Sequence, residues 1–501
     1  MSVIKRRQFL RATLATAPAA LLPYGSLFAA TDTTPANDVE AVTSTGQQII
    51  LKGADVRDFS ARLRGELLRR ESDGYDSARR VWNGSFDRHP ALIARCTGAA
   101  DVVEAVKFAA ASQLLVSVRG GGHSLSGQSV CEKGLMIDLS QMNGVRIDPA
   151  RRVASVEGGA LLGALDREAL ALGLATTTGT VSHTGVGGLT LGGGIGRLAR
   201  RFGMTCDNVR AFDLVTADGK FRGVDAKQSP DLFWALRGGG GNFGIATSFE
   251  FQLHAFDPVV LGGDLVYSFE DAPAVLKHYL EFATHAPEEF YVEATLVRLP
   301  NDQRVLILGF CYSGKVEYGE KAIAPFRQIR KPLQDSVAPM PYVEVQASGD
   351  ELSAHGHKYY IKGGFIQKAT PALADVLLAT IAEANLPAVQ AVTLPPLGGA
   401  VGRVKPAATA FAQRAAEYGV FLFCRWDDAA LSAPVGEWAR SAFARIAPHT
   451  RGFYVNEFNA EDATRLQETY GANFARLVDL KTKYDPDNFF RLNANVAPKA
   501  P

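Results

Sequence analysis

The chain has few cysteines, no excess of charge of either sign and, beyond its N-terminal end, no long apolar run. Its 501 residues include five cysteines, Cys96, Cys131, Cys206, Cys311 and Cys424, and no Cys-x-x-Cys pair. So sparse and odd a number argues against a disulfide scaffold or a zinc ribbon. Lys and Arg total 53 against 52 Asp and Glu, a net charge of +1. This balance gives no electrostatic reason to expect nucleic acid or an anionic membrane as a partner.

The body of the chain also lacks an apolar run of about 18 residues, so no bilayer span is predicted after the N-terminal segment. Hydrophobic residues make up 47% of the chain and charged residues 21%, which is ordinary for a globular protein with a sizeable core. Chains of this length usually form more than one folding unit. We therefore expect a folded protein of two domains.

Residues 1–30 are predicted to form an export signal. The basic run Lys5-Arg6-Arg7 precedes the weakly apolar stretch 12–22 and a small-residue end, the order found in cleavable signal peptides. The core Arg6-Arg7-x-Phe9-Leu10 resembles a twin-arginine (Tat) signal, and a short amphipathic helix is the alternative. Because the Tat machinery exports folded proteins, we expect a periplasmic or secreted protein that acquires its cofactor before export. Residues 31–50 are predicted to be a flexible spacer.

Glycine is concentrated in one part of the chain, where more than half of the 49 glycines lie between Gly120 and Gly244. Predicted strands and helices interleave with these glycines. Strands are expected at 114–118, 135–139 and 153–156, and helices at 101–111 and 161–172. This alternation predicts an α+β ligand-binding domain over residues 51–255.

Beyond residue 255 the composition changes. Glycine becomes rarer, and apolar strands such as 305–308 and 420–423 alternate with Ala-rich helices such as 371–384. We predict a second domain over residues 256–450. The C-terminal segment, residues 451–501, contains a predicted helix at 461–483 and is expected to return to the first domain.

Three glycine-rich loops lie in the first domain, at residues 119–124, 180–196 and 237–245. Successive glycines let backbone N–H groups converge on a phosphate oxygen, because no Cβ blocks the approach. A single such loop is more often a tight turn, but three together could line a dinucleotide. None has the Rossmann arrangement or the Lys-Ser/Thr pair of a P-loop.

Four separated motifs follow one another along the chain. They read RGGGHS from Arg119, GVGGLTLGGGIG from Gly185, DLFWALRGGGGNFGI from Asp231 and NFARLVDLKTKYDPDNFF from Asn473. In this order they resemble the berberine-bridge-enzyme-like family of FAD-linked oxidases, and within it the mono-covalent 6-hydroxynicotine oxidase subgroup. The resemblance implies the vanillyl-alcohol-oxidase (PCMH-type) FAD fold, which is α+β. It also implies two domains, in which an antiparallel sheet covered by helices forms the substrate domain.

The resemblance implies FAD bound covalently through His123. In the family, the histidine of the first glycine loop bonds to the 8α-methyl group of the flavin, which raises the flavin's potential and fixes the ring. From the residues alone, His123 could also be a turn residue, a phosphate contact or a metal ligand. No second ligand stands at a recognisable spacing, so no metal is predicted. Where the family has a second, cysteinyl link this chain has Val181, so we expect no cysteinyl link and interpret Cys206 as a buried apolar residue.

The resemblance also implies which other residues contact the FAD. The pyrophosphate is expected at Arg119, Gly120, Gly121, Gly122 and Ser124. Further contacts are expected at Gly127, Thr180, Gly185, Gly187, Gly188, Gly193, Gly194, Gly244, Ile245, Asn456 and Asn488. Thr184 stands where the family sets access of O₂ to the flavin, and a side chain of its size leaves room for O₂, which favours an oxidase.

Tyr454 and Glu457 are the predicted catalytic residues. The run Tyr454-Val455-Asn456-Glu457 resembles the family's Tyr-x-Asn-Tyr segment beside the flavin, with Glu457 in place of the second tyrosine. A desolvated carboxylate there would have a raised pKa and could act as the general base. The alternative is that Glu457 only begins a turn. The strand 418–426, which carries a base in other members, offers no acidic residue.

Other histidines and one basic cluster are expected to have mainly structural roles. His183 is predicted either to face the substrate or to be a satisfied structural histidine. His355 and His357 alternate as on one strand face. Arg197, Arg200 and Arg201 are predicted to lie on a solvated helix face.

The function expected from these features is that of an FAD-dependent oxidase. It would transfer hydride from a C–H group bearing a hydroxyl or amine to covalent FAD, and O₂ would reoxidise the FAD to give H₂O₂. The partners are then O₂ and a small molecule such as a sugar, phenolic or alkaloid-like compound. Two alternatives stay open: a flavin dehydrogenase using a quinone or other carrier, and a periplasmic nucleotide-binding protein without redox chemistry.

Overall fold

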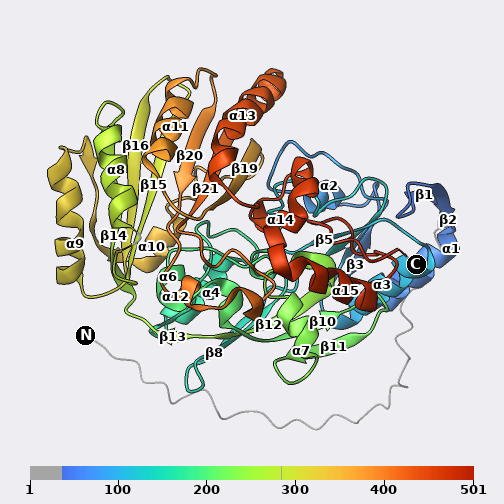
Figure 1. The fold of residues 1–501 in the computed structure, drawn as a ribbon. Coiled ribbons are helices and arrows are strands. Elements are labelled where there is room, and N and C mark those ends of the chain that lie inside the picture. The colour runs from blue at the N-terminus through green and yellow to red at the C-terminus, as the bar shows by residue number, and fades with distance from the viewer. Residues whose placement is uncertain (1–36, 284, 501) are drawn as a thin grey trace, which may run out of the picture.

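The computed structural model describes residues 37–283 and 285–500, which form two lobes (Figure 1). The predicted export signal lies outside these residues. One lobe contains residues up to about 255 together with the C-terminal segment after about 450, and the other contains the residues between them. Within the described ranges, no helix combines the length and apolar character that crossing a bilayer requires.

The first lobe is built on two main sheets. A four-stranded sheet has the order β3-β4-β6-β5, with β6 parallel to both of its neighbours; its strands are β3 (Glu66–Leu68), β4 (Leu92–Arg95), β5 (Val116–Arg119) and β6 (Leu135–Asp138). An antiparallel five-stranded sheet has the order β11-β10-β12-β8-β7; its strands are β7 (Val145–Asp148), β8 (Val153–Glu157), β10 (Val209–Val215), β11 (Phe221–Asp225) and β12 (Ile245–Gln252). Helix α3 (Ala99–Ala111) contacts both sheets and shares an apolar core with them.

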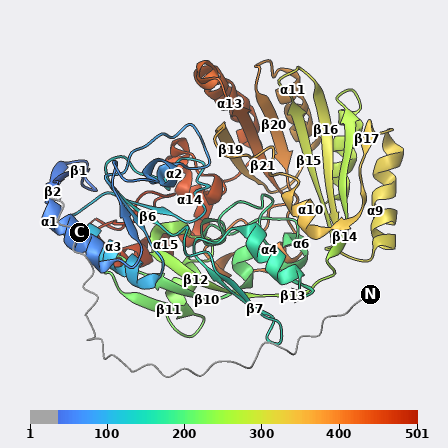
Figure 2. The same cartoon turned by 180° about the vertical axis from the view of Figure 1, so that it is seen from behind.

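Smaller elements complete this lobe. Its other helices are α1 (Gly53–Arg62), α2 (Tyr75–Arg79), α4 (Leu162–Leu170), α5 (Val186–Leu191), α6 (Ala199–Phe202) and α7 (Pro230–Ala235). Strands β9 (Leu174–Ala175) and β13 (His254–Ala255) pair with each other. The segment predicted as a flexible spacer is ordered where it is described, because residues 39–51 form the antiparallel hairpin of β1 (Val39–Val42) and β2 (Gln48–Leu51). Seen from behind, this hairpin lies at the end of the first lobe away from the second (Figure 2).

The second lobe is an antiparallel sheet covered by helices, as expected. Its main path has the order β17-β14-β16-β15-β20-β21-β19, and β18 also pairs with β14. The strands are β14 (Val259–Ser268), β15 (Phe290–Arg298), β16 (Arg304–Tyr312), β17 (Gln334–Asp335), β18 (Ala338–Pro341), β19 (Lys358–Ile366), β20 (Val389–Leu394) and β21 (Tyr418–Trp426). The helices are α8 (Ala272–Phe282), α9 (Val316–Ile329), α10 (Tyr342–Ala347), α11 (Pro371–Ala382), α12 (Ala400–Arg403) and α13 (Ser432–Ile446).

The two faces of this sheet have different surroundings. Successive side chains of a strand point to opposite faces, and on β15 Val292, Ala294 and Leu296 join the apolar core beneath α8, α11 and α13. The alternate residues of β15, beginning with Tyr291 and Glu293, face a cavity between the lobes. The face of the sheet without helices therefore forms one wall of that cavity.

The C-terminal segment returns to the first lobe, but it is not the single helix predicted at 461–483. A 3₁₀ turn over 460–465 leads into α14 (Leu466–Tyr470), and a second turn leads into α15 (Phe474–Tyr484). The break falls at Gly471, whose φ of +51° is costly for residues other than glycine. Leu477 of α15 then packs into the core of the first lobe.

Candidate FAD and substrate site

A cavity of about 690 Å³ lies between the lobes, a size typical of small-molecule and cofactor sites. Residues of the three glycine loops, the helix-free face of the eight-stranded sheet and the C-terminal segment all line it. The loops therefore converge in space, although they are far apart in the sequence.

Close backbone contact joins the first two glycine loops. A Cβ added to Gly121 would lie 2.5 Å from the Cα of Gly185, a distance that real Cβ atoms do not show. Elsewhere the loops leave bare backbone facing open space, since a Cβ added to Gly188 or Gly241 would meet no atom within 4 Å. Glycine thus serves two purposes here: it lets two loops touch, and it keeps part of the cavity wall free of side chains.

Most of the expected FAD contacts line this cavity. They are Gly120, Gly121, Gly122, His123, Ser124, Thr180, Gly185, Gly187, Gly188, Gly244, Ile245 and Asn456. Gly240 and Gly241 of the third loop line it as well.

Five expected contacts are not in the cavity lining. Arg119 points to the buried Asp138, with 3.5 Å between guanidinium and carboxylate. Gly127 lies against the ring of Phe86. The other three contact neighbouring parts of the protein. Gly193 packs beside Met204 and Phe411, and the backbone N–H of Gly194 donates a hydrogen bond to the Tyr454 hydroxyl group. Asn488 lies in the turn after α15.

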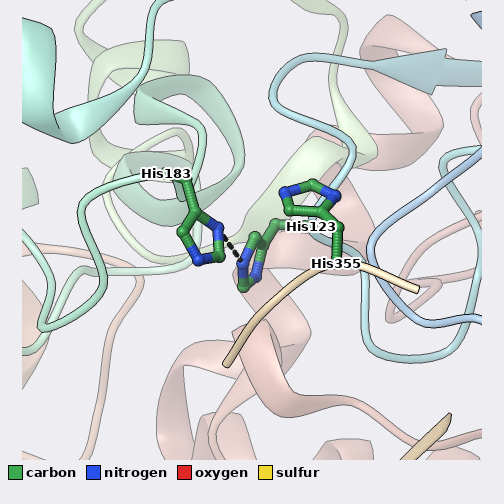
Figure 3. Close-up of side chains that lie close together, drawn as sticks. All are labelled: His123, His183 and His355. Atoms are coloured by element: carbon green, nitrogen blue, oxygen red, sulfur yellow. Dashed lines mark hydrogen bonds between the residues drawn. The ribbon is translucent and has the colours of Figure 1, made fainter. Parts of the chain in front are cut away.

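His123 lies in a cluster of three histidines that the sequence spacing did not reveal. Figure 3 shows its ring pointing toward His183 from the second glycine loop, with His355 of the second lobe beside them. His123 Nε2 and His183 Nδ1 are 3.1 Å apart, and ligand atoms of all three lie within 4.8 Å of one another. Three imidazoles so placed could bind a transition metal. The sequence spacing, from which no metal was predicted, does not show this arrangement.

The environment of His123 keeps its imidazole neutral. Burial, followed by the neighbouring His183 and His355, lowers its pKa to about 3. Trp82 stacks on the ring with 4.4 Å between centroids. A neutral, immobilised imidazole retains a lone pair for bond formation. His183 is not in the cavity lining, and its ring centroid lies 5.0 Å from that of His123. His355 and His357 precede β19 instead of forming part of a strand.

Glu457 lines the cavity from the 3₁₀ turn Val455–Glu457, so it is both a turn residue and a cavity residue. Burial, followed by the nearby Glu293, raises its pKa to about 8. Its Oε2 atom is buried without a hydrogen-bond partner. The carboxyl group is thus poised to exchange a proton near neutral pH with a molecule in the cavity.

Tyr454 also lines the cavity, but its hydroxyl group is occupied. The oxygen accepts hydrogen bonds from the backbone N–H groups of Gly194 and Ile195, at 2.8 and 3.2 Å, and from Asn456 Nδ2 at 2.8 Å. Burial raises the pKa of Tyr454 well above its usual value. These bonds tie the C-terminal segment to the second glycine loop, which places Tyr454 as an anchor beside Glu457.

A second carboxyl group, Glu293, was missed in the sequence. It projects from β15 into the cavity, and Tyr291 donates a 2.7 Å hydrogen bond to its Oε2. Burial raises the pKa of Glu293, and Arg197 opposes that shift. The alternation Tyr291, Glu293, Thr295 within an otherwise apolar strand was the available signal, since period-two polar residues mark an exposed or cavity-facing side.

The predicted solvated face of Arg197, Arg200 and Arg201 is wrong. Arg197 lines the cavity and donates to the Thr180 carbonyl oxygen and to Gln346. Arg200 is only 2% exposed and donates to two backbone carbonyl groups of the second lobe. Glycines at 398 and 399 let that lobe's backbone approach closely enough to cover it. Cys206 is buried, as expected, and all five cysteines are free.

Two family models match this chain. An FAD binding domain matches residues 90–225, and a model described as berberine and berberine like matches residues 453–497. An FAD-linked oxidoreductase of Dictyostelium discoideum is 32% identical over 446 residues, which cover 88% of this chain and 97% of that protein. (R)-6-hydroxynicotine oxidase of Paenarthrobacter nicotinovorans is 31% identical over 452 residues, which cover 87% and 97%.

The chain belongs to the berberine-bridge-enzyme-like family of FAD-linked oxidoreductases.

Solved structures agree with this assignment. The crystal structure of 6-hydroxy-D-nicotine oxidase from Arthrobacter nicotinovorans has a TM-score of 0.81 at 29% identity, covering 87% of this chain and 98% of that one. A chitooligosaccharide oxidase has a TM-score of 0.80 at 24% identity, covering 89% and 100%, and shows the shared fold alone. The PCMH-type α+β fold is thereby confirmed.

The cavity of this berberine-bridge-enzyme-like protein fits FAD. Bare backbone at Gly188 and Gly241 allows close approach of a phosphate or a flat ring. Asn493 and Glu457 line the cavity, and each has a buried side-chain oxygen without a hydrogen-bond partner, which leaves acceptors for polar groups of a ligand. Val181 lines the cavity where a cysteinyl link would begin, and none of the five cysteines does.

Proposed function

We propose that this protein is an oxidase that carries FAD on His123 and no cysteinyl link. A neutral histidine at the wall of an FAD-sized cavity carries the proposal, because alkylation of an imidazole needs its lone pair. The 31% sequence identity with (R)-6-hydroxynicotine oxidase over 452 residues supports the proposal. The bound FAD would accept hydride from a substrate C–H group that bears a hydroxyl or amine, and O₂ would regenerate it with release of H₂O₂.

The residues of the chain then have separate tasks. Glu457 removes the proton from the substrate's hydroxyl or ammonium group, since this residue lines the cavity and its Oε2 atom has no hydrogen-bond partner. Burial, followed by the neighbouring Glu293, raises the pKa of Glu457 to about 8, within reach of neutral pH. Tyr454 and Asn456 hold the turn that carries Glu457 against the second glycine loop.

His183 would control the tautomer of His123. In this role His123 Nε2–H would donate to His183 Nδ1, so that the other ring nitrogen of His123, Nδ1, keeps its lone pair available for attachment. The loop that carries His183 is fixed from the second lobe, because Ser182 donates through its backbone N–H and its hydroxyl group to Asp350.

Reoxidation by O₂ is the preferred second half of the reaction. Thr184 of the second glycine loop lines the cavity, and its side chain is small. A dehydrogenase would instead need a quinone or another carrier. Turnover in air, compared with anaerobic turnover with a quinone, separates these two activities.

Mass spectrometry of the purified protein tests the attachment. The peptide containing His123 should gain the mass of FAD, and His123→Ala should lose covalent flavin while noncovalent FAD can remain. An unmodified His123 peptide in yellow holoprotein would overturn the covalent link. Release of H₂O₂ with a panel of alcohols and amines then tests the oxidase activity.

We also propose export by the Tat route, on the basis of Arg6 and Arg7 alone. Fractionation should find the protein outside the cytoplasm, and Arg6→Lys with Arg7→Lys should retain it inside. Export of the double variant at the normal level would contradict the route.

A further inference from the structure

The cavity wall formed by the eight-stranded sheet has a polar end and an apolar end. On β15, the cavity-lining residues are Tyr291, Glu293, Thr295, Val297 and Leu299, every second residue. The polar residues come first and the aliphatic ones last. At about 3.3 Å per residue, Glu293 and Val297 lie about 13 Å apart along the strand.

Neighbouring strands extend this division across the sheet. Thr295 pairs with Ile307 of β16 and with Thr393 of β20, and Thr393 pairs with Phe421. One row further from Glu293, Val297 pairs with Ala391, which pairs with Phe423. Ile361 of β19 pairs with Phe423 and completes the row. The outer row is therefore apolar over four strands, and all four of its residues line the cavity.

Carboxylates dominate the polar end. Glu293 and Glu457 face the same cavity, and they are close enough for Glu293 to act on Glu457. Arg197 is the one cation lining the cavity among the described residues, and it already donates to Thr180 and to Gln346. Glu457 Oε2 has no partner. A ligand that brings a cationic donor would satisfy this end, because a buried carboxylate is stabilised by an opposite charge.

We propose that the substrate is an amine with an apolar or aromatic body, whose ammonium group binds between Glu293 and Glu457 while the body lies along Val297, Ala391 and Phe423. This inference rests on the proposed oxidase function and narrows its substrate class. A sugar fits the wall poorly. Each of its hydroxyl groups placed on the apolar row would lose its hydrogen bonds to water without gaining a partner.

The reaction balances with O₂ as the oxidant. Glu457 takes one proton from the ammonium group, which leaves the neutral amine. The α-carbon gives up its C–H bond as hydride, two electrons and a proton, to the FAD, and the nitrogen lone pair forms the C=N bond of an iminium ion. Water hydrolyses the iminium ion to a carbonyl compound and an amine or ammonia. O₂ takes the two electrons with two protons and becomes H₂O₂.

An isosteric pair of an amine and an alcohol, together with a disaccharide, tests the proposal on the holoenzyme. 4-Phenylbutylamine, 4-phenylbutanol and cellobiose would be compared by H₂O₂ release and, under anaerobic conditions, by bleaching of the flavin absorbance. We expect kcat/KM for the amine to exceed that for the alcohol at least about tenfold and cellobiose to be inert. An equal or greater value for the alcohol or the sugar overturns the proposal. If no compound turns over, the flavin difference spectrum decides: the amine must bind about tenfold more tightly than the alcohol, and equal binding overturns the proposal.

Failure of the proposed function gives a different result. Amines that bleach the flavin without releasing H₂O₂ would remove the oxidase assignment and leave the substrate class supported. Unmodified His123 would remove the covalent link without affecting the comparison of amine with alcohol.

A variant in the apolar row locates the body of the substrate. Val297→Asn should raise KM for 4-phenylbutylamine about tenfold and leave KM for the shorter propylamine unchanged, with the flavin content intact. The matched control is Val259→Asn on β14, where the side chain is 44% exposed and does not line the cavity; it should change neither value. An equal rise in KM for both amines, or no rise for either, would overturn the placement.

Discussion

At the scale of single residues, Glu457 gives the most direct prediction about pH. Its carboxyl group must be ionised to accept a proton, and burial with Glu293 nearby raises its pKa to about 8. kcat/KM should therefore rise as pH increases through about 8 and level off above it. The measurement is initial-rate kinetics from pH 6 to pH 10 with one substrate whose own titration is known.

Glu457→Gln should lower kcat about 10²–10⁴-fold, the usual contribution of a general base, and abolish this rise. The neighbouring Glu461 provides a control, because it is bonded to Lys362 and Tyr360 at the surface and does not line the cavity. Glu461→Gln should keep the normal profile. If kcat/KM of Glu457→Gln still rose with pH at the same midpoint, Glu457 would be a turn residue and not the general base.

His183 gives a prediction about cofactor attachment that can be tested without measuring enzyme activity. Because its Nδ1 atom holds Nε2 of His123 at 3.1 Å, His183→Ala should lower the fraction of covalently attached flavin at least severalfold in freshly purified protein. His183→Asn should restore part of it through its side-chain amide. The readout is flavin fluorescence of the denatured polypeptide on a gel, with the intact mass as a second measure.

His357 is the matched control, since it pairs with the exposed Asp427 away from the cluster. His357→Ala should retain full attachment. Complete attachment in His183→Ala would show that His123 reacts without help.

The sequence predicted the chemistry of individual loops better than it predicted which residues from distant segments lie next to one another. His123, Glu457 and the replaced cysteine at Val181 could be predicted because each stands inside a local motif. The histidine cluster could not, because His123, His183 and His355 come from three segments that only the packing of the two lobes brings together. The prediction that Arg200 is exposed was wrong for the same reason, since the backbone that covers this residue lies about two hundred residues later in the sequence.

At the scale of elements, the strands and helices of both lobes were predictable where the apolar pattern was strong. The helix predicted at 101–111 is α3, and the helix predicted at 371–384 is α11. The C-terminal helix was predicted too long, because Gly471 adopts a positive φ that composition alone does not reveal. What the sequence left open was sheet register, which decides that Glu293 and Val297 share one face with Phe423.

A buried ion pair in α15 gives a prediction about stability at this scale. Lys481 donates to Asp485, to the Asn242 carbonyl oxygen and to the Phe490 carbonyl oxygen, and both charged side chains are inaccessible. Lys481→Met leaves Asp485 without its cation, so the free energy of unfolding should fall by about 3–5 kcal/mol. Because Asn242 belongs to the third glycine loop, FAD content should fall as well.

Denaturant unfolding monitored by circular dichroism measures this loss. Lys483 serves as a control two residues away: it is paired with Asp231, but its side chain is 60% exposed. Lys483→Met should cost no more than about 1 kcal/mol. Equal effects of the two substitutions would mean that burial of the pair does not matter.

At the scale of the whole molecule, the site exists because two lobes meet. The first lobe supplies the glycine loops and His123, the second supplies Glu293 and the apolar row, and the C-terminal segment supplies Glu457. Buried polar contacts hold the joint: Gln346 of α10 donates to Asp166 of α4, to Thr178 and to the Gly179 carbonyl oxygen. Burial raises the pKa of Asp166 to about 7, so this contact involves a carboxyl group that is easily protonated.

This shared cavity predicts that FAD stabilises both lobes together. His123→Ala, freed of flavin and then titrated with FAD, should show one thermal transition that moves upward, because residues of both lobes line the cavity that FAD would fill. At a hundredfold excess of FAD over its Kd, the gain should be about 2.7 kcal/mol. Covalently loaded wild-type protein should show no shift with added FAD, since its site is already filled. Two separate transitions, of which FAD moves only one, would mean that the cofactor is held by the first lobe alone and that the second lobe closes over it without contributing to its binding.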